Sequence, residues 1–339
     1  MKGVLFPLCC LFLFLPTLSL KAVDFSEGLI RLTLHEEEGR FSLYYLSDPA
    51  QSLYEPLFSD KDPRTTFLAL RVNKKVYRLG ESSAFRFRVE AGRNPSLIFE
   101  SSFLRVIEEF SFIRTAGSSE TNGVKISVTV ENLNSKQASV GARLLIDTML
   151  GEGRGGTPFV TVKGKMNGET AYEANSTERW WLSENCNNLS LMGSISEGVN
   201  TPAESIIFSN WKRLSDASWK INYSSGRSFH YIPFSIGDSA VCYYFDQKPL
   251  NRGETQTWEL LLASGDEQGF AAVSADLRET GAFPDTTPDR SSMEVDLETL
   301  RELLGKLDEY MSPLSGASDE EIAALELSIS RLRDRYNKR

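Results

Sequence analysis

The hydrophobic period of the chain changes near Asp276, and this change limits the folds that the chain can adopt. From about Val23 to Ala275, apolar and polar residues alternate over short segments, which is typical of β-strands. Towards the C-terminus, apolar residues recur at spacings of three and four, which is typical of helices. The sequence therefore predicts a mainly β protein, with a large antiparallel β-sandwich at 23–275, a linker at 276–292 and a C-terminal α-helical hairpin at 293–339.

The first 22 residues have the layout of a cleaved signal peptide. Lys2 precedes an apolar stretch over Val4–Leu15, and small and polar residues follow it. The stretch is shorter than the roughly 20 residues of a bilayer-spanning helix, so we expect a secreted, periplasmic protein with no membrane span after cleavage. Left open are a cut after Ser19 or after Ala22, and a lipid anchor on Cys9 or Cys10.

The mature chain is acidic and keeps two cysteines. Loss of Lys2 and Lys21 from the 37 basic residues leaves 35 against 46 acidic residues, a net charge of −11. Such a body repels phosphate backbones and anionic lipids, so we expect no nucleic-acid partner. In an oxidising compartment, Cys186 and Cys242 form one disulfide or remain two buried thiols, and the sequence leaves both alternatives open.

Two strand pairs are predicted from alternation on both sides of a turn. Alternating apolar residues over 30–34 and 41–45 flank a Glu38-Gly39 turn, which predicts a hairpin. The segments Ala240–Phe245 and Thr255–Ala263 form a second predicted pair, joined by a turn that contains proline and glycine.

One strand is predicted to lie in the middle of a sheet. Residues over Val140–Leu150 are largely apolar on both faces, whereas the segment 124–130 alternates with polar side chains. Arg143 and Asp147 share one face of the central strand but lie about 13 Å apart at the strand rise. Each therefore needs a partner from a neighbouring strand, either in a structural ion pair or in the polar lining of a cleft.

The pattern of strands and turns also resembles a known family. The strings that carry the likeness are NKKVYRLGESSAFRF, VKISVTVENLNSKQASVGARLLIDTMLG, GGTPF, SNWKRL and KPLNRGETQTWELLLASG. They resemble the large sandwich domains of the galactose mutarotase-like group over roughly Val23 to Gly265. The resemblance implies a sandwich fold and a carbohydrate ligand, and enzymes of the group use histidines with a carboxylate base. This chain has only His35 and His230, neither in a matching motif, so no catalytic residue is carried over.

A glycine-rich segment, Gly151–Gly156, follows the central strand. It does not match a phosphate-binding loop, because a strand start follows it instead of a helix, and Glu152 would repel phosphate. One interpretation is a loop in which Asp147, Glu152 and Arg154 bind a polar ligand or a calcium ion, and the other is a plain flexible connection. These three residues are the polar candidates for ligand binding.

Aromatic and catalytic candidates are few. Trp181 adjoins Trp180, so one of the two faces outward on a strand and can stack on a sugar ring, unless both pack in the core. Two isolated histidines do not make a zinc site, and no nucleophile is placed beside a general base. A pair of glycosidase carboxylates stays open, because only spatial separation identifies it. We assign no catalytic residue, no metal ligand and no cofactor.

The tail carries the clearest interaction signal. Ser318 and Glu321 form a capping box at the start of the second predicted helix. Two short helices bury little area alone, so the pair packs on the sandwich, on a second copy or on another protein. We predict a non-catalytic scaffold that assembles with itself or with a cell-envelope protein, the alternative being a carbohydrate-binding or carbohydrate-processing protein. The predicted contact residues are Leu297, Leu300, Leu304, Leu307 and Met311 of the first helix and Ile322, Leu325, Ile329, Leu332 and Tyr336 of the second.

Overall fold

The computed structural model describes residues 22–270, apart from 116–117, 233–234, 236 and 266–268. The predicted signal peptide (except Ala22), the linker, the helical hairpin and its ten predicted contact residues lie outside the described residues. Within the described part, no helix combines the length and the apolar character needed to cross a membrane.

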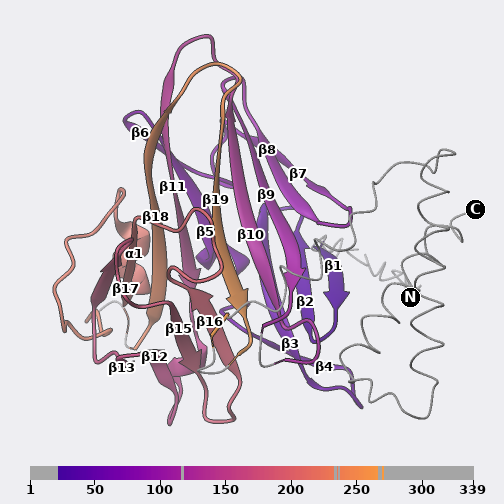
Figure 1. The fold of residues 1–339 in the computed structure, drawn as a ribbon, viewed down its shortest axis with the longest axis vertical. Helices are drawn as coiled ribbons and strands as arrows, with labels where there is room; N and C mark the ends of the chain where they lie inside the picture. Colours follow the sequence, from indigo (N-terminus) through magenta and orange to yellow (C-terminus); the bar gives the residue numbers. More distant parts are fainter. Residues whose placement is uncertain (1–21, 116–117, 233–234, 236, 266–268, 271–339) are drawn as a thin grey trace, which may run out of the picture. The chain divides into compact units, whose positions relative to one another are not determined.

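Three sheets make up the described body, and all their strand pairs are antiparallel, as the sequence predicted for a mainly β fold (Figure 1). The four-stranded sheet has the order β1 (Ala22–Glu27), β2 (Ile30–His35), β3 (Arg40–Asp48) and β4 (Leu53–Pro56). The nine-stranded sheet has the order β13 (Gly164–Lys165), β12 (Thr157–Thr161), β15 (Trp180–Glu184), β16 (Ser190–Ser194), β19 (Thr255–Ala263), β10 (Gly123–Asn132), β9 (Leu104–Ile113), β8 (Ser96–Glu100) and β7 (Arg86–Glu90). The six-stranded sheet has the order β14 (Thr170–Glu173), β17 (Ser205–Asn210), β18 (Ser239–Leu250), β11 (Ala138–Asp147), β5 (Phe67–Val72) and β6 (Lys75–Arg78). The helical elements of this part are α1 (Trp211–Asp216) and two 3₁₀ helices, η1 (Pro63–Thr65) and η2 (Leu150–Glu152).

The six-stranded and nine-stranded sheets pack face to face, as a sandwich requires. Phe208 of β17 and Phe159 of β12 meet with ring centroids 4.8 Å apart, and Phe245 of β18 meets Trp258 of β19 at 5.7 Å. Alternate residues of β10 and β11 contribute to the same apolar cluster, because side chains at every second position of a strand share one face.

One of the two predicted strand pairs turns out to cross between the sheets. β18 and β19 follow one another at a short turn, but β18 pairs with β11 and β19 pairs with β10, so the expected 240–263 pair is not a hydrogen-bonded hairpin. The connection from β10 to β11 changes sheets in the same way. Asn132, which is fully buried, joins the two turns because its Nδ2 donates to the Leu250 carbonyl at 2.8 Å. Alternation predicted these strands correctly but not their partners.

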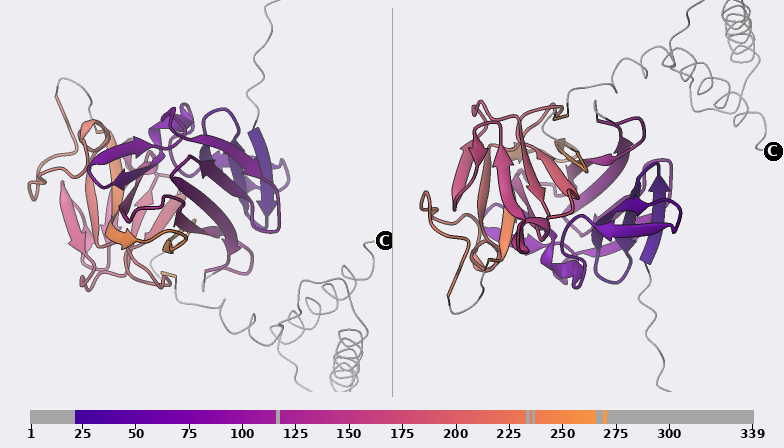
Figure 2. Two further views of the ribbon diagram at one scale, coloured as in Figure 1. Left: turned by 90° about the horizontal axis from the view of Figure 1, so that it is seen from above. Right: turned by 90° about the horizontal axis from the view of Figure 1, so that it is seen from below.

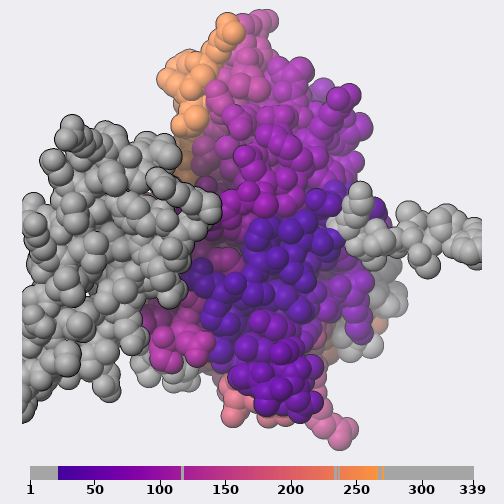
Figure 3. Space-filling view, turned by 90° about the vertical axis from the view of Figure 1, so that its right-hand side faces the viewer, coloured from indigo at the N-terminus to yellow at the C-terminus, as the bar shows by residue number. Residues whose placement is uncertain are grey.

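The four-stranded sheet confirms the predicted N-terminal hairpin. β2 and β3 pair with Leu32 opposite Leu43, and Gly39 in the turn has a φ of +60°, which favours glycine. The sheet packs on the sandwich through Phe41, whose ring lies 4.9 Å from that of Phe110 on β9. Figure 2 shows this indigo sheet beside the purple strands, and Figure 3 shows the face that it forms.

The six-stranded sheet also has a covered outer face. A second apolar cluster, which includes Phe67, Leu145 and Tyr244, lies there together with Leu214 of α1. β11 lies between β18 and β5, so its predicted central position is confirmed. Arg143 is 1% exposed on this outer face, where side chains at odd positions of β11 point.

The partners of Arg143 are backbone carbonyls, which corrects the expected ion pair. Its Nη2 donates to the Ala217 carbonyl at 3.2 Å, and its Nη1 donates to the Trp219 carbonyl. The guanidinium also lies 5.6 Å from the centroid of the Trp219 ring. Arg143 therefore anchors the segment after α1 to the sheet, and it is a structural residue.

Candidate functional site

Asp147 lies at the last position of β11, on the outer face of the six-stranded sheet. Its N–H donates to Thr66 Oγ1 at 3.1 Å, and its carbonyl accepts the Ser59 N–H at 2.9 Å. The residue is 8% exposed. Its backbone is thus fixed by the loop around η1, and its carboxylate is largely removed from water.

Glu152 and Asp238 come from two other segments. Glu152 ends η2, and its Oε1 accepts the Ser239 N–H at 2.6 Å and the Ser239 hydroxyl at 3.1 Å. Asp238 immediately precedes β18, and its carbonyl accepts the Trp211 N–H at 3.0 Å. Backbone and side-chain hydrogen bonds therefore hold both residues in place.

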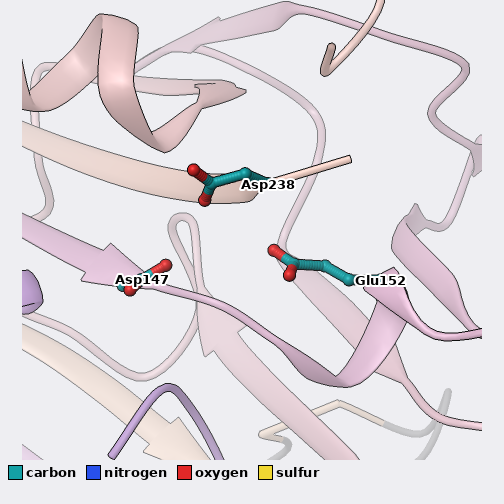
Figure 4. Close-up of side chains that lie close together, drawn as sticks. All are labelled: Asp147, Glu152 and Asp238. Atoms are coloured by element: carbon teal, nitrogen blue, oxygen red, sulfur yellow. The ribbon is translucent and has the colours of Figure 1, made fainter. Parts of the chain in front are cut away.

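The three carboxylates converge at one edge of the sheet (Figure 4). One carboxylate oxygen from each of Asp147, Glu152 and Asp238 lies within 4.8 Å of the others. The cause is the antiparallel register of β11 and β18, in which Asp147 lies opposite Ala240. The end of one strand therefore meets the start of the other, and η2 adds the third carboxylate. We refer to these three residues as the carboxylate cluster.

Burial and mutual repulsion raise the pKa values of the cluster. Burial raises the pKa of Asp147 to about 6, and the neighbouring Asp238 adds to this effect. Glu152 is exposed as a residue, but partial removal of its carboxylate from water raises its pKa to about 7, with further contributions from Asp238 and Asp147, against the lowering effect of the Ser239 hydrogen bonds. The pKa of Asp238 is raised by burial as well.

The cluster can therefore act in two ways. Near neutral pH it holds both ionised and protonated carboxyl groups, so it can accept and donate hydrogen bonds. A cation can take the place of the proton, because oxygen ligands at this spacing suit hard divalent ions. Groups whose pKa values are displaced towards neutrality are also common at functional sites.

The structure brings two of the predicted site residues together and leaves two apart. Asp147 and Glu152 belong to the cluster, whereas Arg154 is an exposed residue of the loop that follows Glu152. Trp181 is 0% exposed, and its Nε1 donates to the Tyr243 hydroxyl, so it belongs to the core. Trp181 therefore packs in the core and does not offer its ring to a sugar.

Asp238 was missed because it lies far from Asp147 in the sequence. A signal was present, since Gly237 and Asp238 mark the turn before an apolar strand. Only the pairing of that strand with 138–147 would have placed Asp238 beside Asp147.

The described cysteines are free. Cys186 is exposed, and Cys242 is buried on the outer face of the six-stranded sheet, where burial raises its pKa to about 11. The structure therefore shows two free thiols at Cys186 and Cys242 and no disulfide between them.

Comparison with known proteins shows a likeness to solved structures. No protein-family model and no curated protein matches the chain. A galactose mutarotase related enzyme from Lactobacillus acidophilus is 7% identical with a TM-score of 0.43, covering 73% of this chain and 98% of that chain. A galactose mutarotase-like protein from Lactobacillus casei is 10% identical with a TM-score of 0.44, covering 72% and 100%. The aldose epimerase homologue from C. elegans is 8% identical with a TM-score of 0.44, covering 73% and 99%. The chain thus resembles galactose mutarotase-like structures, at an identity and TM-score that assign no activity and no site residue.

Proposed function

We propose that the described body binds a carbohydrate at the carboxylate cluster. The observation that carries the proposal is the convergence of Asp147, Glu152 and Asp238, with oxygens within 4.8 Å of one another, at the ends of the central strands β11 and β18. Carboxylates at this spacing accept hydrogen bonds from neighbouring hydroxyl groups of a sugar ring. The strand and turn pattern of the sequence, which resembles the galactose mutarotase-like group, supports the same class of ligand.

The pKa values of the cluster suit a ligand with many hydroxyl groups. At pH 7, Glu152 is partly protonated and Asp147 is mostly ionised, because their pKa values are about 7 and about 6. The cluster then offers a hydrogen-bond donor beside an acceptor, and each sugar hydroxyl is itself both. Glu152 is the exposed member of the cluster, which gives a ligand access from solvent.

A divalent cation is the second candidate ligand, and the oxygen spacing favours it. Calcium binds oxygen at about 2.3–2.6 Å, so three oxygens with this spacing can all reach one ion. Such an ion would offset the repulsion among the three carboxylates.

Titration calorimetry distinguishes the two candidates. D-galactose and D-glucose are titrated in EDTA, and Ca²⁺ is titrated without sugar, into the wild type and into Asp147→Asn and Asp238→Asn. Glu90→Gln, which changes an exposed carboxylate on β7, is the matched control. For carbohydrate binding we expect saturable sugar binding that both cluster variants weaken by about tenfold or more, a loss of about 1.4 kcal/mol.

The outcomes separate clearly. Sugar binding that survives both cluster variants, or no sugar binding in EDTA, contradicts the carbohydrate proposal. Binding of Ca²⁺ alone that both variants abolish assigns the cluster to the cation.

We expect no exchange of aldose anomers above the buffer rate by NMR, because neither histidine lies in a catalytic motif.

A further inference from the structure

A separate pocket of about 360 Å³, lined by both charged and apolar side chains, lies between α1 and the segment that follows it. Its volume falls in the range of roughly 300–1,000 Å³ that is usual for small-molecule sites. None of its lining residues belongs to the carboxylate cluster. The lining includes Arg213 and Asp216 of α1, and Ile221, Asn222, Arg227 and Tyr231 of the following segment.

Two arginines of the pocket share one buried carboxylate. Arg213 Nη2 lies 3.3 Å from Glu169 Oε1, and Arg227 Nε lies 3.7 Å from Glu169 Oε2. Glu169 is 1% exposed, whereas the side chain of Arg227 is 46% exposed. Each guanidinium has five N–H donors, and these contacts use only a few of them. Arg213 also donates to the Asn222 carbonyl at 3.4 Å and its side chain is 16% exposed, so the donors that remain for a ligand come mainly from the more exposed Arg227.

The pocket is held in shape before any ligand arrives. The Glu169 N–H donates to the Arg227 carbonyl at 2.6 Å, and the Gly226 N–H donates to the Glu169 carbonyl at 3.0 Å. The Arg213 guanidinium also lies 5.9 Å from the centroid of the Tyr231 ring. A ligand would not have to order this part of the segment, so less conformational entropy opposes binding.

The arginine pair carries one positive charge more than the carboxylate that it shares, because Arg213 and Arg227 are both paired with Glu169. The other carboxylate of the pocket, Asp216, has basic partners outside this pair. Both of its oxygens lie 2.7 Å from Lys212 Nζ, and Arg78 also acts on it. Glu169 then stands against two arginines, and the remainder matches an anion with a single charge.

We propose that this pocket binds a small organic monocarboxylate. Arginine guanidinium groups recognise carboxylates and phosphates with paired N–H donors, but a phosphate carries close to two charges at neutral pH and would exceed the single charge available. The Tyr231 ring and Ile221 supply an apolar surface for the body of the ligand, and Asn222 supplies a polar group. This inference does not rest on the function proposed for the carboxylate cluster.

Protein-observed NMR titration of the full chain tests the proposal. The probes are benzoate and D-glucuronate, their neutral counterparts benzamide and D-glucose, and glucose 6-phosphate. The variants are Arg227→Gln, which removes one charge, and Arg213→Lys, which keeps the charge and removes the paired donors. The controls are Arg86→Gln, an exposed arginine of β7, and Asp147→Asn in the carboxylate cluster.

We expect at least one acid to bind saturably, its neutral counterpart to bind at least tenfold more weakly, and both pocket variants to weaken the acid by a similar factor. The two control variants should leave acid binding unchanged, which separates this site from the cluster. Melting curves confirm that each variant is folded. The proposal is overturned if neither acid binds, if the neutral probes bind as well as the acids, if glucose 6-phosphate binds more tightly than D-glucuronate, or if both pocket variants retain full affinity.

Discussion

Trp181 and Tyr243 join the two large sheets through a buried hydrogen bond. Trp181 Nε1 of β15 donates to the Tyr243 hydroxyl of β18 at 2.6 Å, and neither residue is more than 1% exposed. Burial raises the pKa of Tyr243, so its hydroxyl stays protonated at all ordinary pH values. The bond satisfies the only polar hydrogen of the indole inside an apolar core.

Tyr243→Phe should destabilise the protein by about 1–3 kcal/mol, because it leaves the buried indole N–H without an acceptor. Urea denaturation measures the loss. Tyr223→Phe is the control, since Tyr223 is 47% exposed and should tolerate the change. Equal stabilities for the two variants would show that the bond contributes nothing.

Gly193→Ala should also destabilise the fold, because Gly193 lies opposite Trp181 in the pairing of β15 with β16. A Cβ at this position would lie 2.3 Å from the Trp181 ring, far inside contact distance. Overpacking of this kind costs typically 1–3 kcal/mol. Thermal denaturation should show a lower Tm than for Gly153→Ala, whose Cβ would meet nothing within 4 Å. A Gly193→Ala variant as stable as Gly153→Ala is the contrary result.

The carboxylate cluster should make stability fall as the pH rises. The folded-state pKa values of Asp147 and Glu152 lie above their ordinary values, at about 6 and about 7, so the folded protein holds protons that the unfolded chain has released. The free-energy cost of ionising these two carboxyl groups in the folded protein is absent near pH 4 and complete above pH 7. Asp147→Asn should therefore raise the free energy of unfolding in EDTA by up to about 3 kcal/mol at pH 8, and by less at pH 5. Thermal melting at the two pH values should show a correspondingly larger increase in Tm at pH 8. A pH dependence identical to that of the wild type would refute this.

Glu108 should also make stability fall as the pH rises, over a range that extends to higher pH. It is 2% exposed on β9, and burial raises its pKa to about 8 although Arg40 acts in the opposite direction. Stability should fall between about pH 4.5 and pH 8, on the order of a few kcal/mol, and Glu108→Gln should remove this slope. Chemical denaturation across this range gives the measurement, with Glu90→Gln as the exposed control. Parallel curves for Glu108→Gln and the wild type would contradict the expectation.

The helices predicted for the C-terminal tail lead to a further prediction about assembly. Its apolar residues at helical spacing predict an assembly surface, so replacing Leu304 and Leu325 by Asp should abolish association and leave the melting of the β-body unchanged. Light scattering with thermal melting gives both readouts. Leu304→Ile and Leu325→Ile together keep the apolar surface and serve as the control. Monomers before and after the change, with a destabilised body, would mean that the tail packs on the body.

Local pattern determined the elements of this fold well. Alternation over 124–130 predicted β10, and apolar residues on both faces over 140–150 predicted β11 and its central position, because the burial of the two faces depends on one strand alone. It also placed Asp147 on this strand and Glu152 in the following loop, and these are two of the three residues in the carboxylate cluster, although the strand ends at Asp147 and not at the predicted Leu150.

Tertiary structure decided everything that depends on pairing between distant segments. Period two does not specify the partner of a strand, so the separation of β18 and β19 into different sheets was not visible in the sequence. The same long-range register of β11 with β18 brings Asp238 to Asp147, and packing between sheets buries Trp181. The outer face of β11 likewise gives Arg143 carbonyl partners from the segment after α1. The sequence alone determined which residues share a strand face, and the tertiary structure decided which faces and strand ends meet.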